Sequence, residues 1–210
     1  MLKLEPKLFP NIGWLETKLP PNVLTFLNKC IKNKTSQGFN NHLAGNIYNS
    51  VLLEDKNEWF FKNVLTPSIL KYIDVFSNRC VPKLLTKDCT YSMSKFWVNF
   101  QKKYEFNPMH DHAGVFSFVV WMKIPSSYKK EKNLPFVKGS NLPSASTFHF
   151  QYTNALGQGA SHYYKLDPSY EGTMLFFPSQ LQHQVYPFYT SDKNRVSISG
   201  NVCLDPDKPV

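Results

Sequence analysis

Arginine is almost absent from this chain. Of its 24 basic residues only Arg79 and Arg195 are arginines, and the other 22 are lysines. The chain has 15 acidic residues. Proteins that read nucleic-acid bases and phosphates rely on arginine, whose planar guanidinium forms paired hydrogen bonds. The formal net charge of +9 therefore indicates a solvated, lysine-covered surface more than a nucleic-acid footprint.

Long hydrophobic runs are also absent. The sequence contains no stretch of about 18 apolar residues, which is the length that a membrane-spanning helix needs. The segment from Met1 to Pro6 lacks the apolar centre of a signal peptide. We therefore expect a cytoplasmic protein that has no membrane partner.

Cysteine is sparse, and its spacing is irregular. Cys30, Cys80, Cys89 and Cys203 lie far apart, and none belongs to a Cys-x-x-Cys motif. In a reducing compartment such residues are core thiols more often than disulfides or zinc ligands. We expect four free thiols.

Aromatic residues, in contrast, are abundant at 15% of the chain, including 17 Phe and 11 Tyr. This composition favours β-structure with packed faces. A length of 210 residues suits one domain. We expect an N-terminal arm and helices over residues 1–80 and a β core over residues 81–210.

The N-terminal part has a mixed pattern. Prolines break residues 1–20, which fits an extended arm or an edge strand. Residues 21–31 have a helical apolar stripe, and residues 34–55 are expected to form a loop. A second helix is predicted over residues 55–78, with Pro67 either kinking it or beginning a second segment.

After Pro82 the pattern becomes that of β-strands. Residues 94–103 alternate between apolar and polar side chains, and residues 115–124 are apolar throughout, as in a central strand buried on both faces. Residues 125–146 form a long insertion of the kind that often serves as a lid. The order of elements predicts an antiparallel barrel or sandwich with N-terminal supporting helices. Further strands are predicted at 147–152, 161–166, 173–177, 184–188 and 196–203.

The segment His110-Asp111-His112 is the first candidate site. On a β-strand, side chains two residues apart project from the same face, so the two histidines could grip one metal ion. Such a pair needs a third ligand. His183 is the candidate, because it follows a buried strand and a Pro-Ser turn.

Arg195 and Ser197 complete a longer pattern. Arg195 lies twelve residues beyond His183, and Ser197 shares its strand face. A His-x-Asp motif or a relative of it, then a distant histidine, then Arg-x-Ser resembles the Fe(II)/2-oxoglutarate-dependent oxygenases. The chain is similar to members found in marine bacteriophages and bacteria from about residue 40 to 203. The segments that carry this resemblance are 42–47, 97–101, 107–114, 176–179 and 195–201.

The resemblance implies a mainly β fold, a double-stranded β-helix (a cupin-like jelly-roll), with iron near one open end. It also implies that dioxygen oxidises a substrate, an unactivated C–H bond being hydroxylated, while 2-oxoglutarate is decarboxylated to succinate. A phage-encoded member would work in the host cytoplasm.

The resemblance assigns the Fe(II) site to His110, His112 and His183, although most relatives carry a carboxylate where this chain has His112. Three arrangements stay open. Iron sits in a three-histidine site, or one histidine of the pair lies outside the first coordination sphere, or Asp111 turns inward through a local bulge. A missing carboxylate would alter the affinity and the redox properties of the metal.

The same resemblance assigns the 5-carboxylate of 2-oxoglutarate to Arg195, with the hydroxyl of Ser197 assisting. Trp97, Asn99 and Gln101 share a strand face that leads to the metal motif. Asn99 or Gln101 could bond a carboxylate of the cosubstrate, and polar packing at a barrel rim explains them equally well.

Three histidines remain outside the motif. We expect His42, His149 and His162 to be structural or surface residues. His149 shares a strand face with Gln151 and could line the cavity.

Two other classes of protein compete with this reading. A cupin-type metal-dependent dioxygenase or isomerase would match the spacing of Gly172, Pro178 and His183, but it needs a glutamate soon after His112, and the next acidic residue is Glu131. A non-catalytic β-helix binding protein is the other alternative. For the substrate, a peptidyl residue such as proline is favoured by analogy, and a nucleic-acid base comes second.

Overall fold

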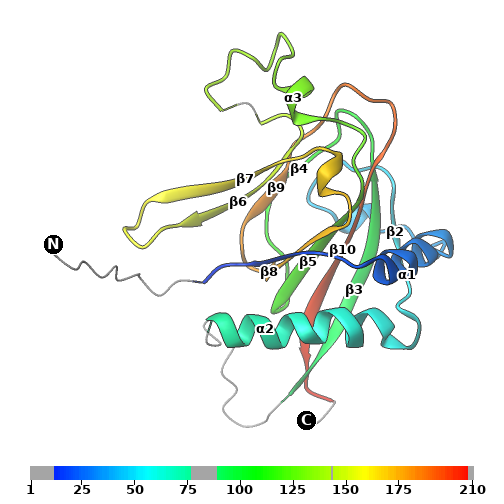
Figure 1. Ribbon diagram of the computed structural model, residues 1–210. Helices are drawn as coiled ribbons and strands as arrows, with labels where there is room; N and C mark the ends of the chain where they lie inside the picture. The colour runs from blue at the N-terminus through cyan, green and yellow to red at the C-terminus, as the bar shows by residue number, and fades with distance from the viewer. Residues whose placement is uncertain (1–11, 77–88, 143, 208–210) are drawn as a thin grey trace, which may run out of the picture.

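The computed structural model describes residues 12–76, 89–142 and 144–207, which form two antiparallel sheets and a few helices (Figure 1). The larger sheet contains β1 (Leu15–Lys18), β2 (Ser50–Leu52), β3 (Thr90–Gln101), β5 (Phe116–Lys123), β8 (Thr173–Pro178) and β10 (Arg195–Asp205). The smaller sheet contains β4 (Asn107–His110), β6 (Thr147–Thr153), β7 (Gly159–Lys165) and β9 (His183–Val185). The α-helices are α1 (Pro21–Lys32), α2 (Thr66–Phe76) and α3 (Tyr128–Glu131).

The strands are ordered β1-β8-β5-β10-β3-β2 in the larger sheet and β4-β9-β6-β7 in the smaller one. From β3 onward the chain passes back and forth between the two sheets, except at the β6–β7 hairpin. This winding is the double-stranded β-helix, so the predicted fold class is confirmed. The space between the sheets is where such a fold can hold a site.

The larger sheet is buried on both faces. Along β5, Phe118 and Val120 pack with the helices, whereas Val119 and Trp121 belong to a second apolar cluster that includes Phe148 of β6. This alternation follows the period of two in a pleated strand. It explains why residues 115–124 are apolar throughout, as the sequence predicted.

Helices α1 and α2 cover the outer face of the larger sheet (Figure 1). Helix α1 begins at Pro21, where the missing backbone N–H costs nothing. It buries Val23, Leu27 and Cys30 against the sheet. The predicted amphipathic helix is therefore confirmed.

The second predicted helix is not one continuous α-helix. Short 3₁₀ and π turns, Lys56–Glu58 and Phe61–Leu65, precede α2. Pro67 lies in the first turn of α2 and has no N–H to give to the turn before it. The chain widens there, and the Thr66 N–H bonds the carbonyl of Phe61, five residues back. The predicted end of this helix, residues 77 and 78, lies outside the described residues.

The sequence patterns missed the short helix α3 within the 125–146 insertion and two elements within residues 34–55. Residues 34–55, predicted to be a loop, contain β2 and a 3₁₀ turn at Asn40–His42. Strand β1 is the edge strand that was expected within residues 1–20. Its predicted neighbours at residues 1–11 lie outside the described part of the chain.

Cys30 is buried, and Cys89 and Cys203 are partly buried. Burial, reinforced by the Asp55 carboxylate, raises the pKa of Cys30 to about 11, so this thiol is protonated at neutral pH. Cys80 and the predicted boundary at residue 80 lie outside the described residues, and the single-domain organisation stays a prediction. No helix in the described part of the chain combines the length and apolarity needed to cross a membrane.

Candidate active site

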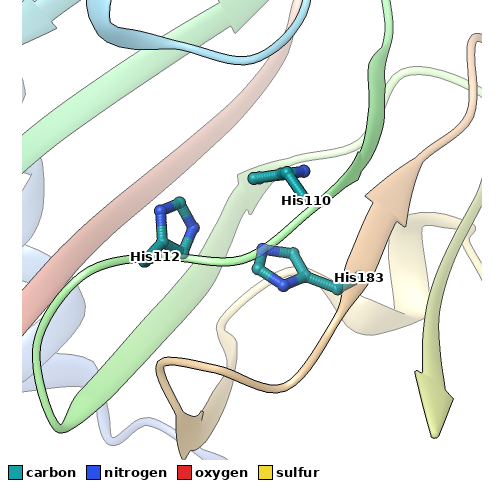
Figure 2. A group of neighbouring side chains, drawn as sticks. All are labelled: His110, His112 and His183. Atoms are coloured by element: carbon teal, nitrogen blue, oxygen red, sulfur yellow. The ribbon is translucent and has the colours of Figure 1, made fainter.

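Three histidines meet between the two sheets (Figure 2). His110 ends β4, His183 begins β9, and the two residues lie directly opposite each other in the ladder. The ring centroids are 4.3 Å apart for His110 and His183, and 5.0 Å apart for His112 and each of the other two. Their candidate ligand nitrogens all lie within 4.8 Å of one another, so the structure brings the three predicted metal ligands together.

The position of His112 differs from the sequence expectation. Strand β4 ends at His110, so His112 lies in the turn after the strand and not on its pleat. The His112 N–H donates to the Ser179 carbonyl at 2.9 Å, which fixes this turn. Gly114 then takes φ +112°, and a side chain there would come within 2.8 Å of the Val202 carbonyl. A turn, and not the strand period, therefore carries His112 to the cluster.

Backbone carbonyls orient two of the three rings. The Nδ1 of His110 lies 2.7 Å from the Pro108 carbonyl, and the Nδ1 of His183 lies 2.9 Å from the Leu181 carbonyl. Because a carbonyl only accepts, each Nδ1 carries the proton and each Nε2 keeps a free lone pair. Metal-binding histidines are oriented in this way in proteins.

All three histidines are neutral at neutral pH. Burial lowers the pKa of His110, and burial together with the neighbouring His110 lowers the pKa of His112 to about 4. The pKa of His183 lies well below its ordinary value, chiefly because of burial and then because of the other two histidines. Neutral imidazoles are good ligands for Fe(II). The donor set therefore fits the metal.

Asp111 does not join the histidines. Its side chain is exposed, and the ligand group contains only His110, His112 and His183 among the described residues. The negative charge of its carboxylate partly opposes the lowering of the pKa of His110 and of His112. Of the three arrangements left open by the sequence, this geometry favours the three-histidine site.

Arg195 begins β10 and is 1% exposed. Its guanidinium donates to the Gln101 carbonyl oxygen at 3.3 Å, to the Tyr186 carbonyl at 3.2 Å and to the Ser146 hydroxyl at 2.9 Å. Its Nε is buried without a partner, and no carboxylate among the described residues forms an ion pair with it. A buried cation held only by neutral groups is costly, and a ligand carboxylate would fit it.

Burial also changes the electrostatics of this group. It lowers the pKa of Arg195 to about 9, and the carboxylate of Glu131 opposes that shift. The guanidinium is therefore charged at neutral pH. The ring of Phe188 lies 4.9 Å from it and covers it.

Ser146, Tyr186 and Phe188 were missed in the sequence as neighbours of Arg195. Ser146 closes the 125–146 insertion with φ +53°, and its hydroxyl also contacts that of Ser126 at 2.8 Å. The two ends of the insertion thus meet beside the guanidinium. A lone serine in a polar loop carries no local signal of this role.

One cavity of about 420 Å³ connects the histidines with Arg195. Ser197 and Asn99 also line it, and they lie opposite each other in the β10–β3 ladder. Asn99 is buried, and its carbonyl oxygen accepts from the Ser50 hydroxyl at 2.6 Å. This volume suits a small ligand. The predicted metal and cosubstrate residues therefore face a common space.

A family model described as "Putative 2OG-Fe(II) oxygenase" matches residues 95–201, which include all three histidines and Arg195. The chain belongs to this family. It is a 2-oxoglutarate-dependent dioxygenase, and Fe(II) and 2-oxoglutarate are its cofactor and cosubstrate. The cupin-type alternative and the non-catalytic binding protein are both set aside by this membership.

Solved structures share the fold of this oxygenase. A 2OG-Fe(II) oxygenase family protein from Burkholderia pseudomallei has a TM-score of 0.52 and 11% identity, covering 94% of this chain and 89% of that one. The viral collagen prolyl hydroxylase vCPH from Paramecium bursaria Chlorella virus-1 has a TM-score of 0.50 and 11% identity, and the match covers 90% of this chain and 94% of that one. OsALKBH1 has a TM-score of 0.50 and 10% identity, and the match covers 92% of this chain and 100% of that one. No curated protein matches the chain.

Among the described residues, His42, His149 and His162 do not belong to the group of metal ligands. His149 is a buried structural residue, as expected, and it does not line the cavity, because the bulge-free pleat of β6 turns Phe148 inward and leaves His149 between Tyr163 and Tyr186. His162 is exposed. His42 is exposed as expected, and it also lines the cavity beside Phe39.

Proposed function

We propose that this oxygenase binds Fe(II) through His110, His112 and His183, and the 5-carboxylate of 2-oxoglutarate through Arg195. Ser197 and Asn99 lie beside Arg195 on the cavity wall and assist in holding the cosubstrate. When bound, Fe(II) and 2-oxoglutarate would allow dioxygen to oxidise a C–H bond of the substrate to an alcohol, while 2-oxoglutarate is converted to succinate and carbon dioxide.

One observation carries this proposal. The cavity has a group of three neutral nitrogen ligands and, in the same space, a buried guanidinium that lacks a carboxylate partner. Neutral imidazoles suit a metal, and an unpaired buried guanidinium suits an anion. A ligand that has a carboxylate at one end and reaches the metal at the other would satisfy both.

The protein's own residues orient the reactants and exclude water. Aromatic and aliphatic side chains of both sheets line the cavity near the histidines. Such walls raise the strength of every electrostatic interaction inside. The wall includes Val119, Trp121, Phe148, Phe177 and Val185.

For the substrate, we propose a peptidyl residue such as proline. The name of the structurally similar viral collagen prolyl hydroxylase supports this choice, and its likeness is one of fold. A nucleic-acid base is the second candidate, supported by the net charge of +9. The scarcity of arginine opposes it.

The proposal is tested by supplying the protein with Fe(II), 2-oxoglutarate and dioxygen and measuring succinate release. We expect slow turnover without substrate and faster turnover with a proline-containing peptide. An anaerobic crystal soak would show which of residues 110–112 coordinate the metal. Absence of both iron binding and 2-oxoglutarate turnover would refute the proposed site.

A further inference from the structure

Two polar groups in the cavity wall, besides those of Arg195, have no hydrogen-bond partner. They are the indole N–H of Trp97 and the side-chain carbonyl oxygen of Asn107, and both residues line the cavity. Buried polar groups in proteins are nearly always bonded, so an unpaired one beside a cavity needs an explanation. A substrate group that bonds them would supply it. The inference below rests on the proposed function.

The Trp97 indole is a donor without an acceptor. Trp97 lies on β3 and is 3% exposed. Its ring centroid is 5.9 Å from that of His112, so the indole borders the metal cluster. An indole N–H can donate and cannot accept. We therefore expect the indole N–H to donate a hydrogen bond to an oxygen of the bound substrate.

Asn107 offers the opposite group. It begins β4, the strand that ends at His110, and is 6% exposed. Its carbonyl oxygen can only accept, so it calls for an N–H or O–H. Trp97 belongs to the larger sheet and Asn107 to the smaller one, so the donor and the acceptor lie on opposite walls of the cavity.

Residues 39–47, which we term the cover segment, contact both Trp97 and Asn107. The ring of Phe39 lies 4.7 Å from that of Trp97. Gly45 lies so close to Asn107 that an added Cβ would come within 2.3 Å of its carbonyl oxygen. The cover segment is held to the β3–β4 loop by two hydrogen bonds between Asn46 and Phe106, of 3.1 and 2.8 Å. A substrate would reach both groups by displacing this segment.

We propose that Trp97 and Asn107 are specificity residues that hold a trans amide group of the substrate. The indole N–H donates to the amide carbonyl, and the Asn107 carbonyl accepts from the amide N–H. The C=O and N–H of a trans amide point in opposite directions, so one amide lying between the sheets can meet both walls. The two polar groups of the cavity wall would therefore bind a peptide, at the backbone amide next to the residue that is oxidised.

The charges that line the cavity favour an amide over a nucleotide. Among Lys, Arg, Asp and Glu, only Arg195 and Asp111 of the described residues line it. Arg195 is reserved for the cosubstrate, and the Asp111 carboxylate near the histidines would repel a phosphate. A neutral amide meets neither obstacle.

The test uses nuclear magnetic resonance of the ¹⁵N-labelled protein with 2-oxoglutarate and with Zn(II) in place of Fe(II). The probe is N-acetylproline N-methylamide, and the Trp97 indole signal is identified with the variant Trp97→Phe. We expect the probe to shift this signal. The Trp14 indole, whose N–H already donates to the Tyr164 hydroxyl at 2.7 Å, should not move.

A second probe tests Asn107. N-acetylproline N,N-dimethylamide keeps the carbonyl and lacks the N–H, so it should bind the wild type roughly tenfold more weakly. In Asn107→Ala the two probes should bind equally. The variant Asn133→Ala, which changes an exposed asparagine, should keep the preference.

Three outcomes overturn the inference in different ways. A shift of the Trp97 signal with cytidine and not with the amide would assign the two groups to a nucleobase. No shift with either probe, while 2-oxoglutarate still binds, would refute amide recognition and leave the proposed function standing. Failure to bind 2-oxoglutarate at all would refute the proposed function, and the inference with it.

Discussion

The two ends of the cavity are built in opposite ways. At the histidine end, the ligands come from the end of one short strand, the start of another and a turn, and all three rings are uncharged at neutral pH. At the arginine end, the long strands β3 and β10 supply Gln101 and Arg195, and the guanidinium is charged and buried before any ligand arrives.

The two ends of the cavity differ in the free energy that it costs to bury their polar groups. One buried and two half-buried neutral imidazoles cost little, because they carry no charge and two of them donate their Nδ1–H to a backbone carbonyl. A buried guanidinium without an anion costs several kcal/mol on general grounds. The protein thus keeps the histidine end open to a cation and the arginine end prepared for an anion. Variants at the two ends should separate metal binding from cosubstrate binding.

The largest effect is expected at the histidine end. His183→Ala removes a buried ligand, so affinity for Co(II), used as a spectroscopic substitute for Fe(II), should fall by more than about 100-fold. Succinate release should be lost with it. His162→Ala, an exposed histidine on β7, is the control and should bind Co(II) like the wild type. Normal Co(II) affinity in His183→Ala would remove His183 from the site.

The arginine end should respond in the complementary way. Arg195→Ala deletes charge-assisted hydrogen bonds to a carboxylate, so affinity for 2-oxoglutarate should fall by about 100-fold while Co(II) affinity changes little. Calorimetry measures both constants. Lys193→Ala removes an exposed cation two residues away and should leave both constants unchanged. Equal losses of metal and cosubstrate binding in Arg195→Ala would show a structural role.

The low pKa values of the three histidines should make metal binding insensitive to mild acid. Protons compete with a metal only below the pKa of its ligands, and that of His112 is lowered to about 4. Metal affinity should therefore persist as the pH falls from 7 to 6, where an ordinary imidazole with a pKa of about 6.5 already takes up protons. A competition titration with a chelator at several pH values measures this. A tenfold loss of affinity between pH 7 and pH 6 would contradict it.

The smallest effect is expected from Ser146→Ala. This change removes the Ser146 hydroxyl that accepts one hydrogen bond, of 2.9 Å, from the guanidinium, and affinity for 2-oxoglutarate should fall by about three- to tenfold. Co(II) affinity should not change. Ser140→Ala alters an exposed serine of the same insertion and is the control. Unchanged 2-oxoglutarate affinity in Ser146→Ala would show that Gln101 and the Tyr186 carbonyl suffice to hold the guanidinium.

Features that depend on strand periodicity could be predicted from the sequence. Trp97, Asn99 and Gln101 share the cavity face of β3, and Arg195 and Ser197 share that of β10, as their spacing of two indicated. The alternation survives because each strand is long and buried on both sides. The same reasoning located the core strands and helix α1.

Features that depend on contacts between distant segments could not be predicted. His112 reaches the cluster through a turn that the Ser179 carbonyl fixes, and Ser146 reaches Arg195 because the insertion closes on itself. Whether His149 would line the cavity could not be decided for a related reason, since the face of β6 that turns inward is set by packing with the larger sheet. None of these contacts leaves a local pattern.

The burial of Arg195 has a kinetic consequence. With 1% of its surface exposed, the guanidinium is reached from the cavity, which the histidines also line. Under the proposed function, a substrate held between Trp97 and Asn107 would lie near the histidines and obstruct entry behind it. Binding should then follow a compulsory order, cosubstrate first and substrate second, and excess substrate should slow turnover by occupying the enzyme too early.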